Sequence, residues 1–358
     1  MNRIATQSAG QIIGLINGRQ VIGLDIAKNV FQLHSVDMST GEIVNLQLRR
    51  AKVLEHFANR APCLIGIEAC GGAHHWARQL TALGHVVRLI HAKAVRPFVT
   101  GNKTDASDAR AIWLAVQQPG TRFVGVKTLG QQATLTLHRQ RQLLMKIKGM
   151  QTNALRGLLY EFGATFARGK NALFSDIEAA LASLAGDIPQ YVADSLREQV
   201  QRIKQLAADI KAIEVKLAAV LRTDADMKRV AAIPGVGLLT ATAAIATMGQ
   251  ASAFKSAREF CAWLGLVPSQ RGTGGKVQLL GISKRGDSYV RTLLIHGARS
   301  VLTHAKEPGA WLQQIQARRP ANVVIVAQAA KMARTIWAVT AHQQAYQRGH
   351  RSTRAQAA

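Results

Sequence analysis

Short hydrophobic runs, separated by polar or glycine-containing breaks, fill the first third of the chain. Residues 20–37 (QVIGLDIAKNVFQLHSVD) contain an apolar run, a polar break at 27–29 and an alternating run, which predicts a β-hairpin. Residues 63–69 and 85–92 are further β-branched runs bounded by turn residues. The segment between them has helical spacing and ends at Gly84, a residue type that commonly terminates helices. Alternating strands and helices predict an α/β domain over roughly the first 125 residues.

From about residue 131 the spacing of apolar residues becomes helical. Beyond a loop near 163–172 these residues recur at steps of three or four, at Val192, Leu196, Val200, Ile203, Leu206, Ile210, Ile213, Leu217 and Val220. The spacing predicts a long amphipathic helix within a helical hairpin or coiled coil. Its apolar stripe fits a core-facing side or an oligomer contact.

A third pattern starts near Met227. It opens with AAIPGVG at 231–237, continues with helical spacing and contains a glycine-rich basic loop at 269–287. We therefore predict an α/β plus α architecture with a mainly helical C-terminal domain. The expected divisions are 18–130 for the α/β domain, 131–225 for the helical and coiled-coil region, 226–345 for the C-terminal domain and 346–358 for a flexible basic tail.

The charge of the chain indicates a nucleic-acid partner. Among 358 residues there are 46 Lys and Arg against 20 Asp and Glu, which gives a net charge of +26. Since 48% of the residues are hydrophobic, the chain can bury real cores and is not a disordered basic tail. The most apolar window, 230–249, is interrupted by Pro234 and three glycines, so we expect packed structure there and no membrane helix.

The compartment is inferred from the start of the chain and from its cysteines. No charged and apolar leader opens the sequence, which favours a cytoplasmic, nucleoid-associated location. Cys63, Cys70 and Cys261 form no CxxC pair, so we expect buried reduced thiols and neither disulfides nor a zinc site.

Four carboxylates stand out in this basic chain: Asp25 in the first strand, Glu68 at a strand end, and Asp105 with Asp108. Oxygen ligands in a basic setting are suited to Mg²⁺ or Mn²⁺ bound beside a phosphodiester. A helix starting at residue 104 or 105 would place both aspartates on one face of its first turn. Taken alone, this pair fits helix capping better, and Glu68 could instead pair with Lys93 or Arg96. The order of all four acids is the order that a ribonuclease-H-like fold requires.

Basic residues and glycines flank these acids and the glycine-rich loop. Lys103 and Arg110 flank the aspartate pair, and further cations in two groups would contact a nucleic-acid backbone. The first group, on a helical stretch, is Arg139, Arg141, Lys146, Lys148 and Arg156; the second, around the loop, is Lys276, Lys284, Arg285 and Arg291. For the group around the loop, a solvated basic loop is the alternative. The amides of Gly235 and Gly237 would face a phosphate in a helix-hairpin-helix element, or the turn merely packs. His74 and His75 are interpreted as packing or phosphate-contacting residues, and GTGGK lacks the upstream glycine of a nucleotide-binding loop.

Five motifs in order, IGLDIAKNVF, GIEACGG, NKTDASDARAI, IPGVG and GISKRGDSYVRTLL, cover the chain from about residue 20 to 340. Together they resemble the DEDD transposases of bacterial insertion sequences, in particular the IS110 family and its IS1111-type branch. The resemblance implies a RuvC-like N-terminal domain whose four acids correspond to Asp25, Glu68, Asp105 and Asp108. It also implies a C-terminal transposase domain with a serine that forms a covalent phosphoserine, in a site shared with a neighbouring protomer.

The family pattern further implies a bridge RNA that pairs with donor and target DNA. The position that aligns with the serine holds Thr273, whose hydroxyl has the same chemistry but whose β-methyl crowds the attack. Ser269 and Ser283 remain rival nucleophiles. The long helix and the shared site suggest homodimers that assemble into a homotetramer.

Three functions are therefore compared. We expect a DNA transposase or recombinase that uses metal-bound acids and a hydroxyl nucleophile. A junction endonuclease that uses water, with Thr273 only structural, is the second hypothesis. A non-catalytic nucleic-acid-binding protein, in which the acids are caps and ion pairs, is the third.

Overall fold

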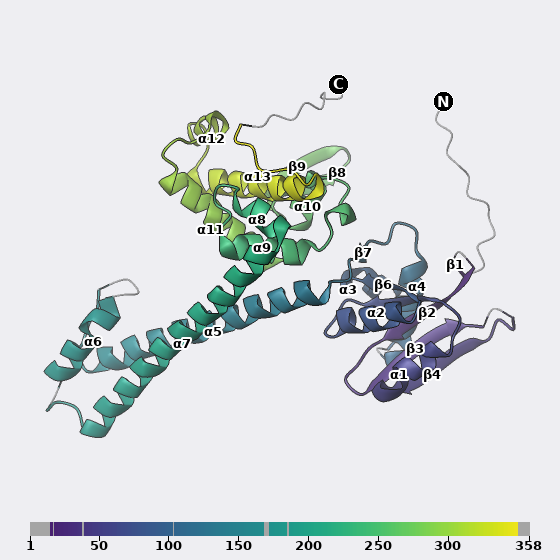
Figure 1. The fold of residues 1–358 in the computed structure, drawn as a ribbon, viewed down its shortest axis with the longest axis horizontal. Coiled ribbons are helices and arrows are strands. Elements are labelled where there is room, and N and C mark those ends of the chain that lie inside the picture. The colour runs from purple at the N-terminus through teal and green to yellow at the C-terminus, as the bar shows by residue number, and fades with distance from the viewer. Residues whose placement is uncertain are drawn as a thin grey trace. The chain divides into compact units, whose positions relative to one another are not determined.

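The computed structural model describes residues 15–16, 18–37, 39–102, 104–167, 172–184 and 186–349. The chain divides into two compact units between Thr128 and Leu129, and each unit is described by itself. Figure 1 labels their helices and strands.

The first unit is a mixed β-sheet covered by helices. Its strands are β1 Leu15–Ile16, β2 Arg19–Asp25, β3 Val30–Val36, β4 Ile43–Arg49, β5 Leu64–Glu68, β6 Val86–Ile90 and β7 Phe123–Val124. Its helices are α1 Val53–Ala58, α2 Ala73–Ala82, α3 Ala92–Val95 and α4 Asp105–Gln117, with 3-10 turns η1 Arg50–Lys52 and η2 Arg96–Phe98. The α/β prediction for this part of the chain is confirmed.

The described residues form a sheet with the strand order β4-β3-β2-β5-β6-β7, and β1 pairs with β2. The pairs β2–β5 and β5–β6 are parallel, and the other pairs are antiparallel. β2 and β3 are the predicted hairpin, with its break at 26–29. The carboxyl ends of the parallel strands β2 and β5 therefore lie side by side at one edge.

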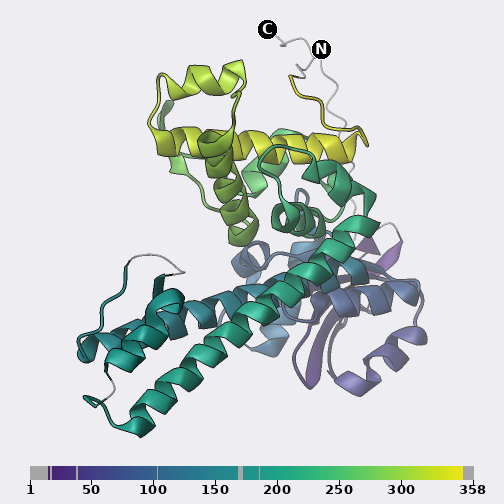
Figure 2. The same cartoon turned by 60° about the vertical axis from the view of Figure 1, so that its left-hand side comes forward.

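The two faces of the sheet bury different residues because side chains alternate along each strand. Ile22 and Leu24 of β2 belong to a core that includes Trp76 and Leu80 of α2. Val21 of β2 belongs to a second core with residues of α4. Helices thus cover both faces of the sheet, as the ribbon also shows (Figure 2).

The second unit is mainly helical. Its helices are α5 Leu129–Glu161, α6 Ala172–Ser183, α7 Gln190–Thr223, α8 Ala225–Ala231, α9 Leu238–Met248, α10 Ala257–Trp263, α11 Ser288–His304, α12 Ala310–Gln316 and α13 Ala321–Ala341, with the 3-10 turn η3 Ala251–Ala253. Two strands, β8 Pro268–Thr273 and β9 Lys276–Ile282, form a separate antiparallel hairpin.

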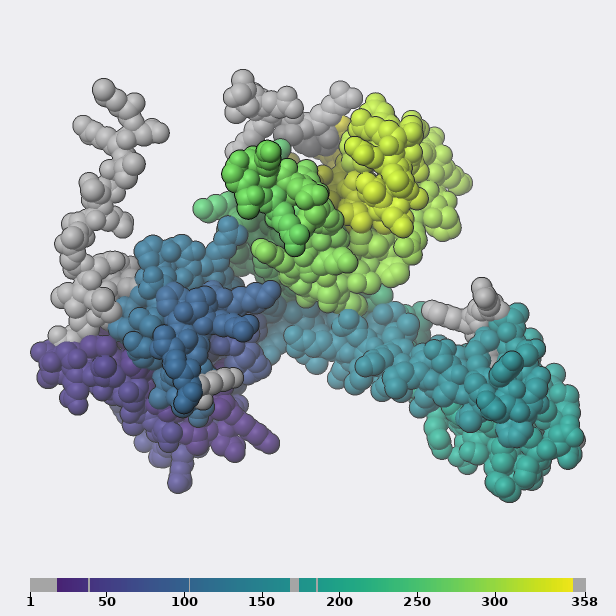
Figure 3. Space-filling model, turned by 180° about the vertical axis from the view of Figure 1, so that it is seen from behind, coloured from purple at the N-terminus to yellow at the C-terminus, as the bar shows by residue number. Residues whose placement is uncertain are grey.

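The predicted long amphipathic helix is α7, which packs along α5 in a helical hairpin. In Figure 3 the teal helices of this hairpin extend beyond the green-to-yellow helical body of the same unit. All nine residues of the predicted stripe are buried or half-buried. Toward the far end of the hairpin, Leu196, Val200 and Ile203 pack with residues of α6, so much of the stripe faces a core within the chain.

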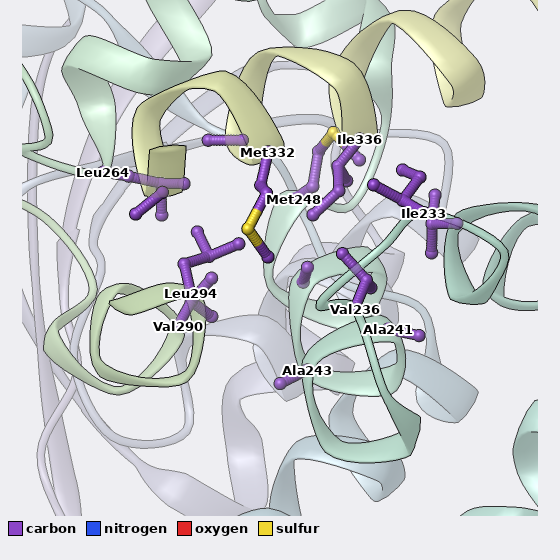
Figure 4. Packing of buried hydrophobic residues seen from close by; sticks show 14 of the residues in the cluster. Ile233, Val236, Ala241, Ala243, Met248, Leu264, Val290, Leu294, Met332 and Ile336 are labelled. Carbon is purple, nitrogen blue, oxygen red and sulfur yellow. The ribbon is translucent and has the colours of Figure 1, made fainter. Parts of the chain in front are cut away.

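The C-terminal helices surround a continuous apolar core (Figure 4). Every residue of α9 from Thr240 to Met248 is buried, as expected for the window at 230–249. By length and composition α13 could cross a membrane. Met332 and Ile336 of this helix instead pack with Met248 and Ile233, so we assign α13 to the protein core.

Two expectations are corrected here. The region predicted as a glycine-rich loop at 269–287 is largely the hairpin β8–β9. Cys63 and Cys261 are buried thiols, but Cys70 is exposed. All three are free, as predicted.

Candidate functional site

The same short pattern, a glycine followed two residues later by an acid, ends both β2 and β5. Gly23 pairs with Gly66 in parallel register, and Leu24 pairs with Ile67. Because side chains alternate, Asp25 and Glu68 point to the same face as the two glycines. That face is covered by α4: a Cβ on Gly23 would lie 2.2 Å from the carbonyl oxygen of Ala109. Because glycine has no side chain, α4 can lie directly on the strands that carry the acids.

The direction of α4 brings its first turn to the same end of the sheet. Trp113 Nε1 donates a hydrogen bond to the Val21 carbonyl (3.1 Å), and Ala109, one turn earlier, lies over Gly23. A helical turn and two strand residues have similar lengths. The turn of α4 that precedes Ala109 therefore lies over the part of β2 that follows Gly23, toward Asp25. Asp105 and Asp108 therefore come to the strand ends that carry Asp25 and Glu68.

A pocket of about 490 Å³ at this end contains two of the acids. Glu68 and Asp108 line it, together with Lys93 and Arg96. Burial, together with the negative charges of Glu68 and Asp25, raises the pKa of the Cys70 thiol, so both acids lie close to Cys70. Asp25, Glu68 and Asp108 are half-buried and Asp105 is exposed.

Helix capping is performed by other residues than the two aspartates. The helix begins at Asp105, as the metal interpretation assumed, and its cap is Thr104. Thr104 Oγ1 accepts from the Ser107 amide (3.2 Å), and Ser107 Oγ accepts from the Thr104 amide (2.9 Å). Neither aspartate is the cap itself, because this reciprocal box performs that role, but both lie in the first turn of α4, where the helix dipole favours negative charge.

Ion pairing does not engage the acids of the pocket either. In the described part of the chain, neither Glu68 nor Asp108 forms an ion pair, so the alternative pairing of Glu68 with Lys93 or Arg96 is also wrong. Half-buried carboxylates without a cationic partner attract a cation. This is the first observation in favour of metal binding.

The donor set fits a hard divalent ion that is completed by substrate. Within the described ranges, no three His, Cys, Asp or Glu side chains stand close enough together to hold a metal ion. Mg²⁺ does not need such a cage, because it commonly binds one or two carboxylates plus water and substrate phosphate. Glu68 and Asp108 supply two such carboxylates in one pocket.

The three candidate nucleophiles differ in how their hydroxyls are placed. Ser269 Oγ donates to the Gly281 carbonyl (3.0 Å), and Ser283 Oγ is buried. Thr273 is exposed at the tip of the hairpin, where it pairs with Lys276 across the turn Gly274–Gly275. Both turn glycines have positive φ (56° and 81°), as a type I′ turn requires. Thr273 therefore presents its hydroxyl to solvent, which favours it over the two serines.

The base of this hairpin is a tightly fixed loop. Lys284 has a φ of 53°, in the left-handed region that is unusual for a lysine. A Cβ on Gly286 would lie 1.9 Å from the Trp263 carbonyl oxygen. Arg291 Nη1 donates to the carbonyls of Leu264 (3.0 Å) and Arg285 (2.9 Å). Arg291 thus holds the loop, while Lys284, Arg285 and Lys276 are exposed.

The predicted basic helical stretch lies on α5 and has mixed roles. Arg139 and Lys146 are exposed and Lys148 is half-buried. Arg141 forms an ion pair with Glu214 of α7 (2.8 Å), and Arg156 donates to the Ala167 carbonyl (3.2 Å). A phosphate contact by either of these arginines would compete with an existing interaction.

The other residues predicted to contact nucleic acid differ in their surroundings. Gly235 has a φ of 83°, and a Cβ there would lie 2.7 Å from the Gly297 carbonyl oxygen, so this glycine packs against α11. Gly237, at the start of α9, has open space around it. Arg110 is exposed and donates to Thr100 (3.2 Å). Lys103 lies outside the described residues.

Packing accounts for most of the motif at 74–76. Trp76 is buried against Phe31, and His74 Nδ1 accepts from the Lys127 amide (3.2 Å). Lys93 and Arg96 entered the sequence interpretation only as partners of Glu68. Their place in the pocket depends on how α3 and η2 fold back beside α4, which no local pattern indicates.

Known proteins similar to this chain are transposases. A family model described as "Transposase IS116/IS110/IS902 family" matches residues 227–312. The chain is 45% identical over 335 residues to a probable family 20 transposase of Pseudomonas aeruginosa, covering 92% of this chain and 98% of that protein. It is 38% identical to the transposase for insertion sequence element IS1111A of Coxiella burnetii, with 92% of each chain covered, and 36% identical to that of IS1328 of Yersinia enterocolitica, covering 89% of this chain and 96% of that protein. The chain therefore belongs to the IS116/IS110/IS902 family of insertion-sequence transposases, and it is an enzyme of DNA transposition.

Proposed function

We propose that this transposase cuts and rejoins DNA strands through a covalent link between Thr273 and a DNA phosphate, assisted by a divalent metal ion held at the N-terminal carboxylates. The observation that carries the proposal is the pocket in which Glu68 and Asp108 lie without an ion-pair partner among the described residues. The mixed sheet with the order β4-β3-β2-β5-β6-β7 supports a ribonuclease-H-like, RuvC-like domain.

The carboxylates would bind Mg²⁺ or Mn²⁺. Glu68 and Asp108 would hold the ion, with Asp25 at the neighbouring strand end and Asp105 at the start of α4. When bound, the ion supplies positive charge that stabilises the reacting phosphate. The chain's own cations, Lys93 and Arg96, would keep the DNA strand at the pocket in spite of the four acids.

Thr273 would supply the nucleophile. Its hydroxyl oxygen forms a bond to phosphorus while the bond from phosphorus to one DNA oxygen breaks, and the hydroxyl proton is passed on to the leaving oxygen or to water. In the rejoining step a DNA hydroxyl attacks the same phosphorus and releases Thr273. Each exchange replaces one phosphate ester by another, so no external energy source is needed.

The partners follow from the family and the charge. Donor and target DNA are the substrates, and a structured bridge RNA would select the sites by base pairing. The net charge of +26 supports binding to such polyanions. A homodimer that assembles into a homotetramer would bring Thr273 of one protomer to the carboxylates of another.

The test is strand cutting by two kinds of variant. The substrate is DNA that carries the junction of the element with its flanks, supplied with RNA transcribed from those flanks and with Mg²⁺. Asp108→Asn and Glu68→Gln keep the shape of the side chain but lose the charge, so we expect cutting to fall by a factor on the order of 100 or more. Thr273→Ala should also lose cutting, and Thr273→Ser should retain it.

The covalent product separates this mechanism from the alternatives. We expect the unaltered protein, denatured during the reaction, to carry labelled DNA that Thr273→Ala does not carry. Cutting without any such adduct would favour an endonuclease that uses water. Full activity in Asp108→Asn and Glu68→Gln would overturn the metal assignment.

A further inference from the structure

A second hollow lies beside the carboxylate pocket, and the two share one lysine. The first pocket, of about 490 Å³, is lined by Glu68, Asp108, Arg96 and Lys93 among others. The second, of about 510 Å³, is lined by Lys93 with its neighbours His91 and Ala94, and by one further segment: Pro119, Gly120, Thr121 and Arg122. Lys93 therefore stands on the ridge between two adjoining hollows.

The two hollows differ in charge. The first is lined by two carboxylates and two cations, Lys93 and Arg96, so acids are present there that could hold a metal ion. The second is lined by three basic side chains, His91, Lys93 and Arg122, all exposed, and by no acid. A hollow with this charge next to the cutting site attracts phosphate and does not attract a metal ion.

The backbone around the second hollow is fixed by local hydrogen bonds. His91 Nδ1 accepts from the Lys93 amide (3.1 Å), which holds the start of α3. On the opposite side, Thr121 Oγ1 donates to the Ala115 carbonyl (3.0 Å). The strand pairing of Phe123 with Ile90 joins the two sides. The site is thus formed before any ligand arrives.

Lys93 has no competing partner. Its ammonium group forms no hydrogen bond or ion pair within the described ranges, although Glu68 and Asp108 line the same pocket. A lysine that shares two hollows can hold a phosphate that lies between them, because its three donors rotate freely.

We propose that the DNA strand being cut runs from the carboxylate pocket over Lys93 into the second hollow, where Lys93 and Arg122 hold the phosphates next to the scissile one. The inference rests on the proposed function, because that function places the scissile phosphate at Glu68 and Asp108. It adds a second binding site and a path for the strand. Lys93 and Arg122 are positioning residues: they hold the strand and do not touch the reacting atoms.

The test measures how DNA binding depends on salt when cutting is prevented. A labelled single-stranded DNA of about 12 nucleotides, a length that a single binding groove typically covers, is titrated with the full chain in EDTA at 50 and 200 mM salt. Each phosphate contact on a single strand contributes about 0.7 to the slope of log affinity against log salt. Removing two contacts in Lys93→Ala/Arg122→Ala should lower the slope by about 1.4, so the loss of affinity between the two salt concentrations becomes about sevenfold smaller.

The matched control is Arg49→Ala. Arg49 is exposed on β4, at the opposite edge of the sheet from β6 and β7. We expect its slope to equal that of the unaltered protein, and circular dichroism should show that all variants are folded. An unchanged slope in the double variant, or a fall of about 0.7 in Arg49→Ala, the loss of one contact, would overturn the proposal.

The salt dependence of DNA binding can be measured whether or not the protein cuts DNA. Because binding is measured in EDTA, a protein that never cuts DNA can still show the expected change of slope, which would leave the strand path intact and remove the proposed mechanism. Conversely, active cutting with unchanged slopes would remove the path and leave the mechanism intact.

Discussion

Two glycines decide where the carboxylates of this transposase can lie. Gly23 and Gly66 stand side by side two residues before Asp25 and Glu68. A Cβ on Gly66 would lie 3.0 Å from Val116, and one on Gly23 would overlap the backbone of α4. Because neither residue has a side chain, the helix that carries Asp105 and Asp108 can pack against the strand ends. Two glycines thus set the geometry of the four carboxylates.

Gly23→Ala should therefore destabilise the first unit. The new methyl group would meet Ala109 O at 2.2 Å and Trp113 N at 2.6 Å, and neither backbone atom can move without shifting α4. Overpacking of this kind costs about 1–3 kcal/mol or more. Urea unfolding should show a lower midpoint, and cutting should fall as well because Asp108 moves with the helix.

Gly125→Ala is the control for this substitution. Gly125 has open space around it and no positive φ, so its replacement should leave the free energy of unfolding within about 0.5 kcal/mol of the unaltered protein. A midpoint for Gly23→Ala that matches this control would show that α4 can move away at no cost.

Sequence alone located the acids but not their surroundings. Asp25 and Glu68 could be predicted because an acid after an apolar, β-branched run falls at a strand end. The contacts around Asp105 and Glu68 could not be predicted from the sequence. Thr104 and Ser107 cap the helix, and Lys93 forms no ion pair with a described residue, although two carboxylates line the same pocket. Such contacts depend on distances between segments, which spacing along the chain does not encode.

At the scale of elements, a buried histidine ties three helices of the second unit together. His138 of α5 contacts Tyr289 of α11 through Nδ1 (2.9 Å) and Thr242 of α9 through Nε2 (2.9 Å). Thr242 donates its own proton to the Leu238 carbonyl (2.7 Å), so it accepts from His138. The histidine is thereby neutral with its proton on Nε2, and it accepts the Tyr289 hydroxyl at Nδ1.

This network predicts a loss of stability at mildly acidic pH. Burial, with Arg141 nearby, lowers the pKa of His138 from 6.5 to about 4, and Asp287 only partly opposes this shift. The unfolded chain therefore binds a proton below pH 6.5 that the folded chain refuses until about pH 4. The stabilisation is complete above pH 6.5 and is lost as the pH falls toward 4, with a total of about 3 kcal/mol.

The measurement compares the unaltered protein with His138→Gln. Glutamine can replace part of the hydrogen bonding but does not titrate. Free energies of unfolding measured between pH 4 and 8 should fall more steeply with acid for the unaltered protein. Parallel curves would mean that His138 is protonated in the folded protein or is reached by water.

The elements could be predicted to different degrees. The long helix α7 followed from its apolar spacing because one face of it is buried along most of its length. The hairpin β8–β9 was predicted as a loop because no face of it is buried: Val277 and Leu279 are exposed, and Gly272, Gly274 and Gly275 interrupt any alternation. A hairpin without a core carries little of the pattern by which strands are found.

At the scale of the whole molecule, the two kinds of residue in the proposed mechanism belong to different units. Asp108 and Glu68 lie in the first unit, and Thr273 lies in the second. The proposed chemistry needs both, and the family resemblance assigns them to neighbouring protomers. A site shared between two protomers predicts how mixtures of two inactive variants behave.

Mixing two inactive proteins should restore activity. Asp108→Asn lacks the carboxylate and Thr273→Ala lacks the hydroxyl, so each alone should fail to cut. If subunits exchange at random, half of the dimers contain one of each, and each such dimer has one complete site and one doubly defective site. Single-strand cutting should then recover to about a quarter of the unaltered level.

The control is a double variant, Asp108→Asn/Thr273→Ala, mixed with unaltered protein, which also gives one copy of each defect per mixed dimer. Here every site lacks one group, so a mixed dimer should be inactive. Unaltered dimers make up about a quarter of this second mixture, so it too should retain about a quarter of the unaltered activity. If both groups act within one protomer, the first mixture should stay inactive and the second should retain about half of the unaltered activity.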